Sequence, residues 1–134
     1  MRVIAEPDLD LVTSWLAAFV GELGVAEPRP SAEIARRRLA AGDLYVWDDG
    51  GPVSMAGFGG KTPNGIRVNL VYTPEAKRRR GYATACVAAL TQMLIDRGNS
   101  YCALYADLAN PTSNAIYQRI GYEHLCDAAE YELG

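Results

Sequence analysis

Four consecutive basic residues, 77–80, stand directly before Gly81 at the expected start of a helix. A helix N-terminus carries unpaired N–H groups and a partial positive charge, so a glycine-containing turn leading into it can hold a phosphate with main-chain donors. Gly81 and Ala83 keep this backbone approachable, and the arginines add fork-shaped donors that suit a pyrophosphate or a phosphorylated nucleotide. Taken alone, the basic run is as typical of a solvent-exposed loop as it is of a phosphate-binding turn.

A second group of candidate residues begins at Asn110, after the next expected strand. The Asn110 amide can donate to and accept from an amide-rich ligand arm, and Pro111 suits the start of a helix. Tyr117 then lies about one turn into that helix. Taken alone, the stretch 110–113 also fits an ordinary helix cap, and Tyr117 also fits an aromatic residue of the core.

The elements between these groups place both of them at one edge of a sheet. Residues 66–73 and 101–108 have the patterns of strands. Between them the apolar positions of 81–97 follow helical spacing up to a stop at Gly98; these positions are Ala83, Val87, Leu90 and Leu94. A strand, a helix and a strand form a βαβ unit, whose parallel strands end at the edge where open α/β sheets bind ligands.

The remaining patterns predict further helices and antiparallel strands around this unit. Asp8 is placed to cap a helix that ends at Gly24, and Ser31 is placed to cap a second one through residue 39. A turn at 48–52 predicts a hairpin between its flanking strands. The other expected elements are an extended segment at 2–6, strands at 44–47 and 53–58, a last helix from 112 or 113 to 120, and a closing strand or hairpin at 122–133. The fold class is therefore α/β with a mixed sheet, in a single domain of residues 1–134.

Together the two groups resemble the motifs of the GCN5-related N-acetyltransferase superfamily. Its pyrophosphate motif is Q/R-x-x-G-x-G/A, which Arg78, Gly81 and Ala83 match. Its later element, N-x-x-S/A-x-x-x-Y before a Gly-aromatic pair, is matched by Asn110, Ser113, Tyr117, Gly121 and Tyr122. The likeness covers about residues 66–125 in detail. It implies the superfamily's fold: a mixed, mostly antiparallel sheet with a central parallel βαβ cofactor-binding unit flanked by helices.

The resemblance also implies acetyl-CoA as the acetyl-donor cosubstrate. The backbone of 71–73 would pair with the pantetheine arm like an added strand, and the amides of 79–84 would hold the pyrophosphate. Asn110 would contact the pantetheine, Ser113 or Asn114 would contact the cofactor nearby, and Tyr117 would lie beside the sulfur. The implied cofactor-binding residues are Val71, Tyr72, Thr73, Arg78, Arg79, Arg80, Gly81, Tyr82, Ala83, Thr84, Asn110, Ser113, Asn114 and Tyr117.

The implied reaction is direct attack of a primary amine, carried by a small molecule or a peptide, on the thioester in a ternary complex. The Val71 N–H would polarise the carbonyl, and Tyr117 would be the catalytic general acid that protonates the departing thiolate. A phenol with an ordinary pKa near 10 is protonated at neutral pH, as this role requires. The general base stays open among Glu22, Glu27, Glu33, Glu75 and Asp107. Asn69 and Arg67 either line the acceptor pocket or form an outward polar face.

Composition narrows the classes of partner. A formal net charge of -3 argues against a nucleic-acid-binding surface, and no apolar run approaches the length of a membrane span. Cys86, Cys102 and Cys126 have no CxxC spacing, so we expect small buried side chains and neither a disulfide nor a metal site. His124 is the only histidine, which leaves no basis for a histidine cluster. We therefore expect a cytoplasmic protein that binds no metal.

Two departures from the superfamily pattern and two alternatives complete the prediction. Arg79 stands where many relatives have glycine. The segment after Tyr122 is short for two long closing strands, so a second subunit of a homodimer could complete the acceptor cleft. The same cradle could serve a non-catalytic acyl-CoA-binding or sensor module. The chain could also be the catalytic half of a larger acetyltransferase.

Overall fold

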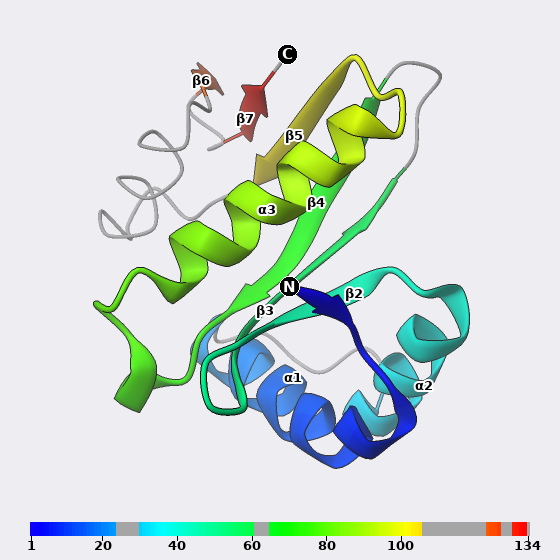
Figure 1. Ribbon diagram of the computed structural model, residues 1–134, viewed down its shortest axis with the longest axis vertical. Helices are drawn as coiled ribbons and strands as arrows, with labels where there is room; N and C mark the ends of the chain where they lie inside the picture. Colours follow the sequence, from blue (N-terminus) through cyan, green and yellow to red (C-terminus); the bar gives the residue numbers. More distant parts are fainter. Residues whose placement is uncertain (24–29, 61–64, 106–122, 127–129, 134) are drawn as a thin grey trace.

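The computed structural model describes residues 1–23, 30–60, 65–105, 123–126 and 130–133. Their strands form one mixed sheet in the order β1-β2-β3-β4-β5-β7-β6 (Figure 1). The strands are β1 (Arg2–Val3), β2 (Leu44–Asp48), β3 (Pro52–Gly59), β4 (Gly65–Tyr72), β5 (Tyr101–Tyr105), β6 (Glu123–Cys126) and β7 (Glu130–Leu133). All neighbouring pairs are antiparallel except β4 and β5, which run parallel. The mixed α/β fold and its central βαβ unit are thereby confirmed.

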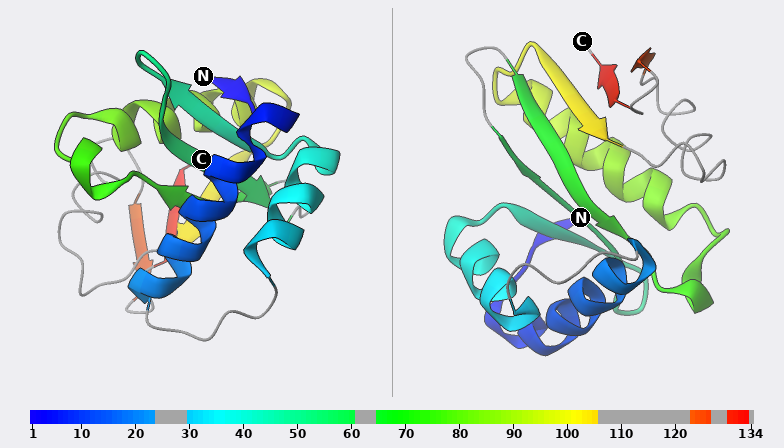
Figure 2. Two further views of the ribbon diagram at one scale, coloured as in Figure 1. Left: turned by 90° about the horizontal axis from the view of Figure 1, so that it is seen from below. Right: turned by 180° about the vertical axis from the view of Figure 1, so that it is seen from behind.

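Helices cover both faces of the sheet (Figure 2). α3 (Tyr82–Asp96) lies on one face and buries Val87, Leu90 and Leu94 of the expected apolar stripe, whereas Ala83 is half-buried. α1 (Leu9–Leu23) and α2 (Ser31–Ala41) lie on the other face, where Leu16 is almost fully buried. Along β2, Tyr45 faces the α3 core while Leu44 faces the opposite core, as the two-residue period of a strand requires.

The first two helices begin differently from the sequence prediction. Asp8 does not cap α1: its carboxylate accepts from the Ala5 N–H at 2.7 Å and closes a 3-10 turn, η1 (Glu6–Asp8), before α1 starts. Ser31 is itself the first residue of α2, and Pro30 is the N-cap. Pro30 has φ of -55°, and its carbonyl accepts from the amide of Ile34 at 3.2 Å. Its ψ of 134° is not helical, so Ser31 is the first helical residue and the helix starts one residue earlier than a Ser cap would allow.

The predicted hairpins are present. β2 and β3 pair through a tight turn in which the Asp49 N–H donates to the Gly51 carbonyl at 2.8 Å. β6 and β7 form the short closing hairpin, and β7 pairs with β5. The expected helix at 112–120 lies outside the described residues. Within the described ranges, no helix is long and apolar enough to cross a membrane.

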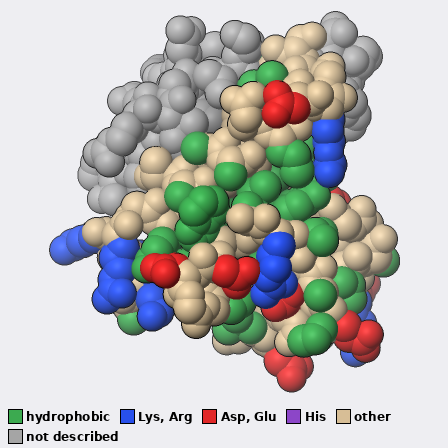
Figure 3. All heavy atoms as spheres, in the orientation of Figure 1, with side chains coloured by type: hydrophobic (Ala, Val, Ile, Leu, Met, Phe, Trp, Pro, Cys, Tyr) green, Lys and Arg blue, Asp and Glu red, His purple; other side chains and the backbone are tan. Residues whose placement is uncertain are grey.

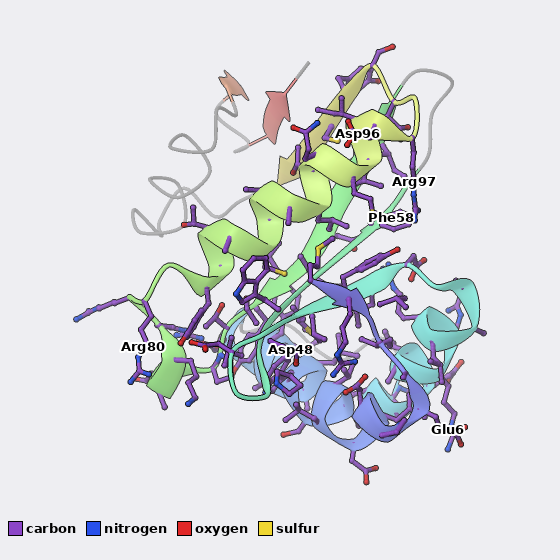
Figure 4. All side chains as sticks on the ribbon, in the orientation of Figure 1. Glu6, Asp48, Phe58, Arg80, Asp96 and Arg97 are labelled. Atoms are coloured by element: carbon purple, nitrogen blue, oxygen red, sulfur yellow. The ribbon has the colours of Figure 1, made fainter. Side chains whose placement is uncertain are left out.

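The two ends of α3 reach opposite ends of the sheet. Just beyond its C-terminal end, Arg97 donates to the Tyr45 hydroxyl at 3.2 Å, and the Tyr45 ring stacks on Phe58 with centroids 6.3 Å apart. Figure 4 shows Arg97 beside Phe58 and, at the far end of α3, Arg80 on the loop that leads into the helix. α3 is thus anchored at one end, and its N-terminus is presented at the other.

Candidate functional site

β4 contains a bulge shortly before its end. Its pairing with β3 is regular up to Gly57↔Asn69 and resumes at Met55↔Tyr72, so β4 has one residue more than β3 in this interval. Leu70, inside the interval, has a positive φ of 51°. The left-handed conformation costs a residue with a side chain about 1–2 kcal/mol. Bulges and strain of this kind cluster next to ligand sites, where they redirect main-chain groups.

β4 extends beyond its described pairing with β5. The parallel ladder with β5 ends at Val68↔Leu104, although β5 continues to Tyr105 and pairs there with β7. Among the described residues, the β5-facing edge of 69–72 has no strand partner. This stretch contains Val71 and Tyr72, two of the predicted cofactor-binding residues, and both are half-buried. An unpaired edge can bind an extended ligand through main-chain N–H and C=O groups.

The loop from β4 to α3 contains the predicted phosphate cradle. After a 3-10 turn, η2 (Glu75–Lys77), Arg79 and Gly81 both have left-handed backbone, with φ of 66° and 81°. Gly81 is the N-cap of α3, and no side chain caps the helix there. The first helical hydrogen bond runs from the Ala85 N–H to the Gly81 carbonyl at 3.0 Å. The amides of 82–84 therefore lack a helical acceptor and can bind an anion.

The cradle is open above Gly81. A Cβ placed on this glycine would meet no atom within 4 Å, so steric crowding does not explain the glycine. Its positive φ does, because side chains rarely adopt that conformation. A hollow of about 310 Å³ lies at the loop and is lined by Glu75, Arg78 and Arg79. Figure 3 shows basic side chains gathered at the end of the molecule where Figure 1 draws this loop.

Arg78 directs its guanidinium to protein groups. Nε donates to the Thr73 carbonyl at 2.8 Å, and Nη2 donates to both carboxylate oxygens of Glu22, at 2.6 and 2.9 Å. The guanidinium carbon also lies 5.6 Å from the centre of the Tyr72 ring. Glu22, one of the candidate general bases, is therefore occupied as the partner of Arg78. No local sequence pattern could have indicated this pair, because 56 positions separate the two residues.

A buried pair of hydroxyls fixes the end of β4 to β3. Ser54, which has no exposed surface, donates to the Tyr72 carbonyl at 3.2 Å, and its oxygen lies 2.7 Å from the Thr73 hydroxyl. Since the single Ser54 proton goes to the carbonyl, Thr73 donates to Ser54. Ser54 was not among the predicted site residues, because a serine in an apolar strand carries no spacing signal. Its hydroxyl pairs with that of Thr73, which was among the predicted site residues.

Tyr82 connects the start of α3 to the β2–β3 hairpin. Its phenol donates a short hydrogen bond to the Asp49 carboxylate. This carboxylate raises the pKa of the Tyr82 phenol, with a smaller opposing effect from Arg80. The phenol is thus held by the hairpin, and the Tyr82 main-chain N–H is one of the amides without a helical acceptor at the start of α3.

Other predicted residues fall outside or beside this arrangement. Asn110, Ser113, Asn114 and Tyr117 lie outside the described residues, as do Glu27 and Asp107. Glu75 lines the hollow, whereas Glu33 lies on α2. Arg67 is exposed on β4, and the Oδ1 atom of Asn69 is buried without a hydrogen-bond partner.

The described cysteines are buried and have poorly reactive thiols. Cys86 and Cys102 are free and fully buried, as predicted. Burial raises the pKa of the Cys86 thiol to about 12 and raises the pKa of the Cys102 thiol as well. Both therefore stay protonated at neutral pH, and a protonated buried thiol is a poor nucleophile. Cys126 has no described side chain, and the described residues contain no group of acidic, histidine or cysteine side chains able to hold a metal.

Comparison with known proteins agrees with the fold. The family model described as FR47-like protein matches residues 51–131, which is more than half of the chain. A comparison with curated proteins gave no match. Among solved structures, yncA, a putative acetyltransferase from Salmonella typhimurium with its cofactor acetyl-CoA, is 14% identical. Its TM-score is 0.82, and the match covers 98% of this chain and 91% of that one.

Two structures from Brucella melitensis are also similar. A ribosomal-protein-alanine N-acetyltransferase is 16% identical with a TM-score of 0.81, over 98% of this chain and 97% of that one. A GNAT family acetyltransferase in complex with acetyl-CoA is 20% identical, with a TM-score of 0.70. This match covers 99% of this chain and 85% of that one. The mixed sheet with its parallel β4–β5 pair thus matches the fold of GCN5-related N-acetyltransferases. The chain belongs to the FR47-like family within that superfamily.

Proposed function

We propose that the chain transfers an acetyl group from acetyl-CoA to a primary amine of a small molecule or peptide. One observation carries the proposal: the bulge at Leu70, the β5-facing edge of 69–72 and the uncapped start of α3 follow one another within a single short segment. Together they offer main-chain hydrogen-bonding groups to an extended amide and then to an anion. Acetyl-CoA has a thioester, a diamide arm and a pyrophosphate in that order.

The binding mode uses the main chain. The pantetheine arm would pair with Val71, Tyr72 and Thr73 as an added strand. The amides of 79–84 would hold the pyrophosphate at the N-terminus of α3, where the helix dipole favours negative charge. Arg79 and Arg80 add positive potential to this end. Similar folds crystallised with acetyl-CoA, from Salmonella typhimurium and Brucella melitensis, support the assignment.

The chemistry needs few side chains. The Val71 N–H, beside the bulge, would donate to the thioester carbonyl where negative charge develops during attack. Holding the amine and the thioester together supplies several kcal/mol of the barrier reduction through orientation. Tyr117 would protonate the departing thiolate, with Asn110 and Ser113 or Asn114 beside the cofactor. The transfer is direct, in a ternary complex, so the enzyme carries no acetyl group of its own.

We propose a primary amine as acceptor, in keeping with the alanine N-acetyltransferase whose fold is similar. Residues 1–134 would act as a single cytoplasmic domain, with a homodimer as one way to complete the acceptor cleft.

Release of free CoA thiol from acetyl-CoA, measured with a panel of amines and peptide N-termini, tests the proposal. An enzyme produces thiol in proportion to acetylated amine, whereas an acyl-CoA sensor binds acetyl-CoA and releases none. Tyr117→Phe should lower kcat by about 10²-fold or more, as loss of a general acid does, in a variant that still binds CoA. An unchanged kcat between pH 6 and 9 would remove Tyr117 from the mechanism.

A further inference from the structure

Arg78 joins three parts of the protein that surround the proposed cofactor site. Through Glu22 it reaches the last turn of α1, and through the Thr73 carbonyl it reaches the end of β4. It belongs itself to the loop that leads to the amides of 79–84. The Tyr72 ring under its guanidinium also contacts Trp15 of α1, with centroids 6.1 Å apart. α1 is thus connected to the cofactor strand and to the cofactor loop by adjacent contacts.

Two of the three guanidinium nitrogens of Arg78, Nε and Nη2, donate to protein groups. Nη2 donates to both oxygens of the Glu22 carboxylate, and Nε donates to the main-chain carbonyl of Thr73. A lysine could not reproduce this arrangement, because its single ammonium nitrogen replaces two donor nitrogens held in one plane. The neighbouring Arg79 lines the hollow and has no ion pair among the described residues, so Arg79 supplies charge that Arg78 does not.

We propose that Arg78 is a positioning residue, a latch between Glu22 of α1 and the β4–α3 loop, which holds the loop amides ready for the pyrophosphate. The inference rests on the proposed function. It assigns to the Arg78 side chain a role different from phosphate contact. It also couples occupancy of the cofactor site to the end of α1.

The coupling is reciprocal by linkage. If the intact latch tightens CoA binding by a given factor, bound CoA stabilises the latch by the same factor. The side chains of Arg78 and Glu22 are 39% and 48% exposed, so the ion pair is screened by water. We therefore expect a factor of about 3–10 rather than a complete loss of binding, arising from preorganisation of the loop.

Removal of the Glu22 charge distinguishes the latch from direct contact between Arg78 and the pyrophosphate, because the two arrangements predict opposite changes in CoA affinity. In the latch, Glu22→Gln frees the loop and weakens CoA binding. If Arg78 instead turned to the pyrophosphate, the same change would release its guanidinium and remove a negative charge near an anionic ligand. CoA would then bind as tightly as before or more tightly.

Calorimetric titration of the whole chain with CoA carries out the test. Glu22→Gln and Arg78→Lys should each raise the Kd about 3–10-fold, and the double variant should be no weaker than either single one. Asp10→Asn is the matched control, because it removes one exposed carboxylate from the other end of α1 and should keep the wild-type Kd. Amide hydrogen exchange gives a second readout: CoA should slow exchange at 19–22 in the wild type and not in Glu22→Gln.

Three results would overturn the latch. They are an unchanged or lower Kd for Glu22→Gln, an equal rise in Kd for Asp10→Asn, and CoA-dependent protection of 19–22 that survives Glu22→Gln. A wild-type chain that binds no CoA would instead overturn the proposed function, and the latch with it.

Discussion

Arg79 and Gly81 both adopt left-handed backbone, at φ of 66° and 81°, on either side of Arg80 at the entry to α3. Main-chain turns of this kind present successive N–H groups to one side and form anion-binding concavities. One of the two positions is occupied by glycine, which adopts the conformation freely, and the other by an arginine, which is strained there. The geometry of the cradle therefore depends on both residues, and each can be tested by substitution.

Substitutions at Gly81 test whether CoA binding requires the left-handed backbone or glycine itself. Gly81→Val should weaken CoA binding at least about 10-fold and destabilise the fold by about 1–2 kcal/mol, because a β-branched residue resists positive φ. Gly81→Asn should stay within about 3-fold of the wild-type affinity, since asparagine tolerates this region. Titration calorimetry and thermal unfolding measure the two quantities. Equal losses for valine and asparagine would show that the left-handed backbone is not what the site requires.

At Arg79, substitution by glycine should relieve strain. We expect Arg79→Gly to leave the free energy of unfolding unchanged or to raise it by up to about 1 kcal/mol. Arg80→Gly, whose backbone is not left-handed, should lower it by about 0.5–1 kcal/mol because glycine gains more freedom in the unfolded chain. Urea unfolding of the two variants gives the comparison. A larger loss of stability at position 79 than at position 80 would contradict the strain assignment.

The buried hydroxyl pair predicts non-additive stability. Ser54→Ala leaves the Thr73 hydroxyl and the Tyr72 carbonyl without their buried partner and should cost about 1–3 kcal/mol. Thr73→Val in the same background should cost little more, because the hydroxyl left unpaired is then removed as well. A double-mutant cycle by chemical denaturation measures the coupling. Strictly additive losses would mean that the two hydroxyls do not act together.

Asp8 predicts a pH dependence of stability. Hydrogen bonds from Arg2, with a smaller contribution from the Ala5 N–H, lower the pKa of the Asp8 carboxyl in the folded protein. A lowered folded pKa stabilises the fold above the unfolded pKa of about 3.8, and this stability is lost as the pH falls through the folded value. Asp8→Asn should therefore cost about 2 kcal/mol at pH 7 and much less at pH 2. A difference that stays constant from pH 7 to pH 2 would exclude the carboxylate as its source.

Local sequence patterns predicted the strands and the helix that surround the site. The bulge at Leu70 and the Arg78–Glu22 pair depend on contacts between residues that are distant in the sequence. Gly81 marked the start of α3 correctly, because a glycine before an amphipathic run is a local signal of a helix start. The bulge at Leu70 has no such signal, since leucine fits a regular strand and only the register with β3 reveals the extra residue. The Arg78 side chain matched a motif position, yet its partner Glu22 comes from a distant helix.

The central claim is that acetyl-CoA binds along the β5-facing edge of 69–72 and into the start of α3. Backbone amide NMR of the labelled chain during titration with CoA tests it most directly. The account predicts the largest shift changes at Val71, at Thr73 and at the amides of 79–84, with small changes along β1 and β2. Saturable CoA binding that leaves 71–73 and 79–84 unperturbed, or no binding at all, would contradict it.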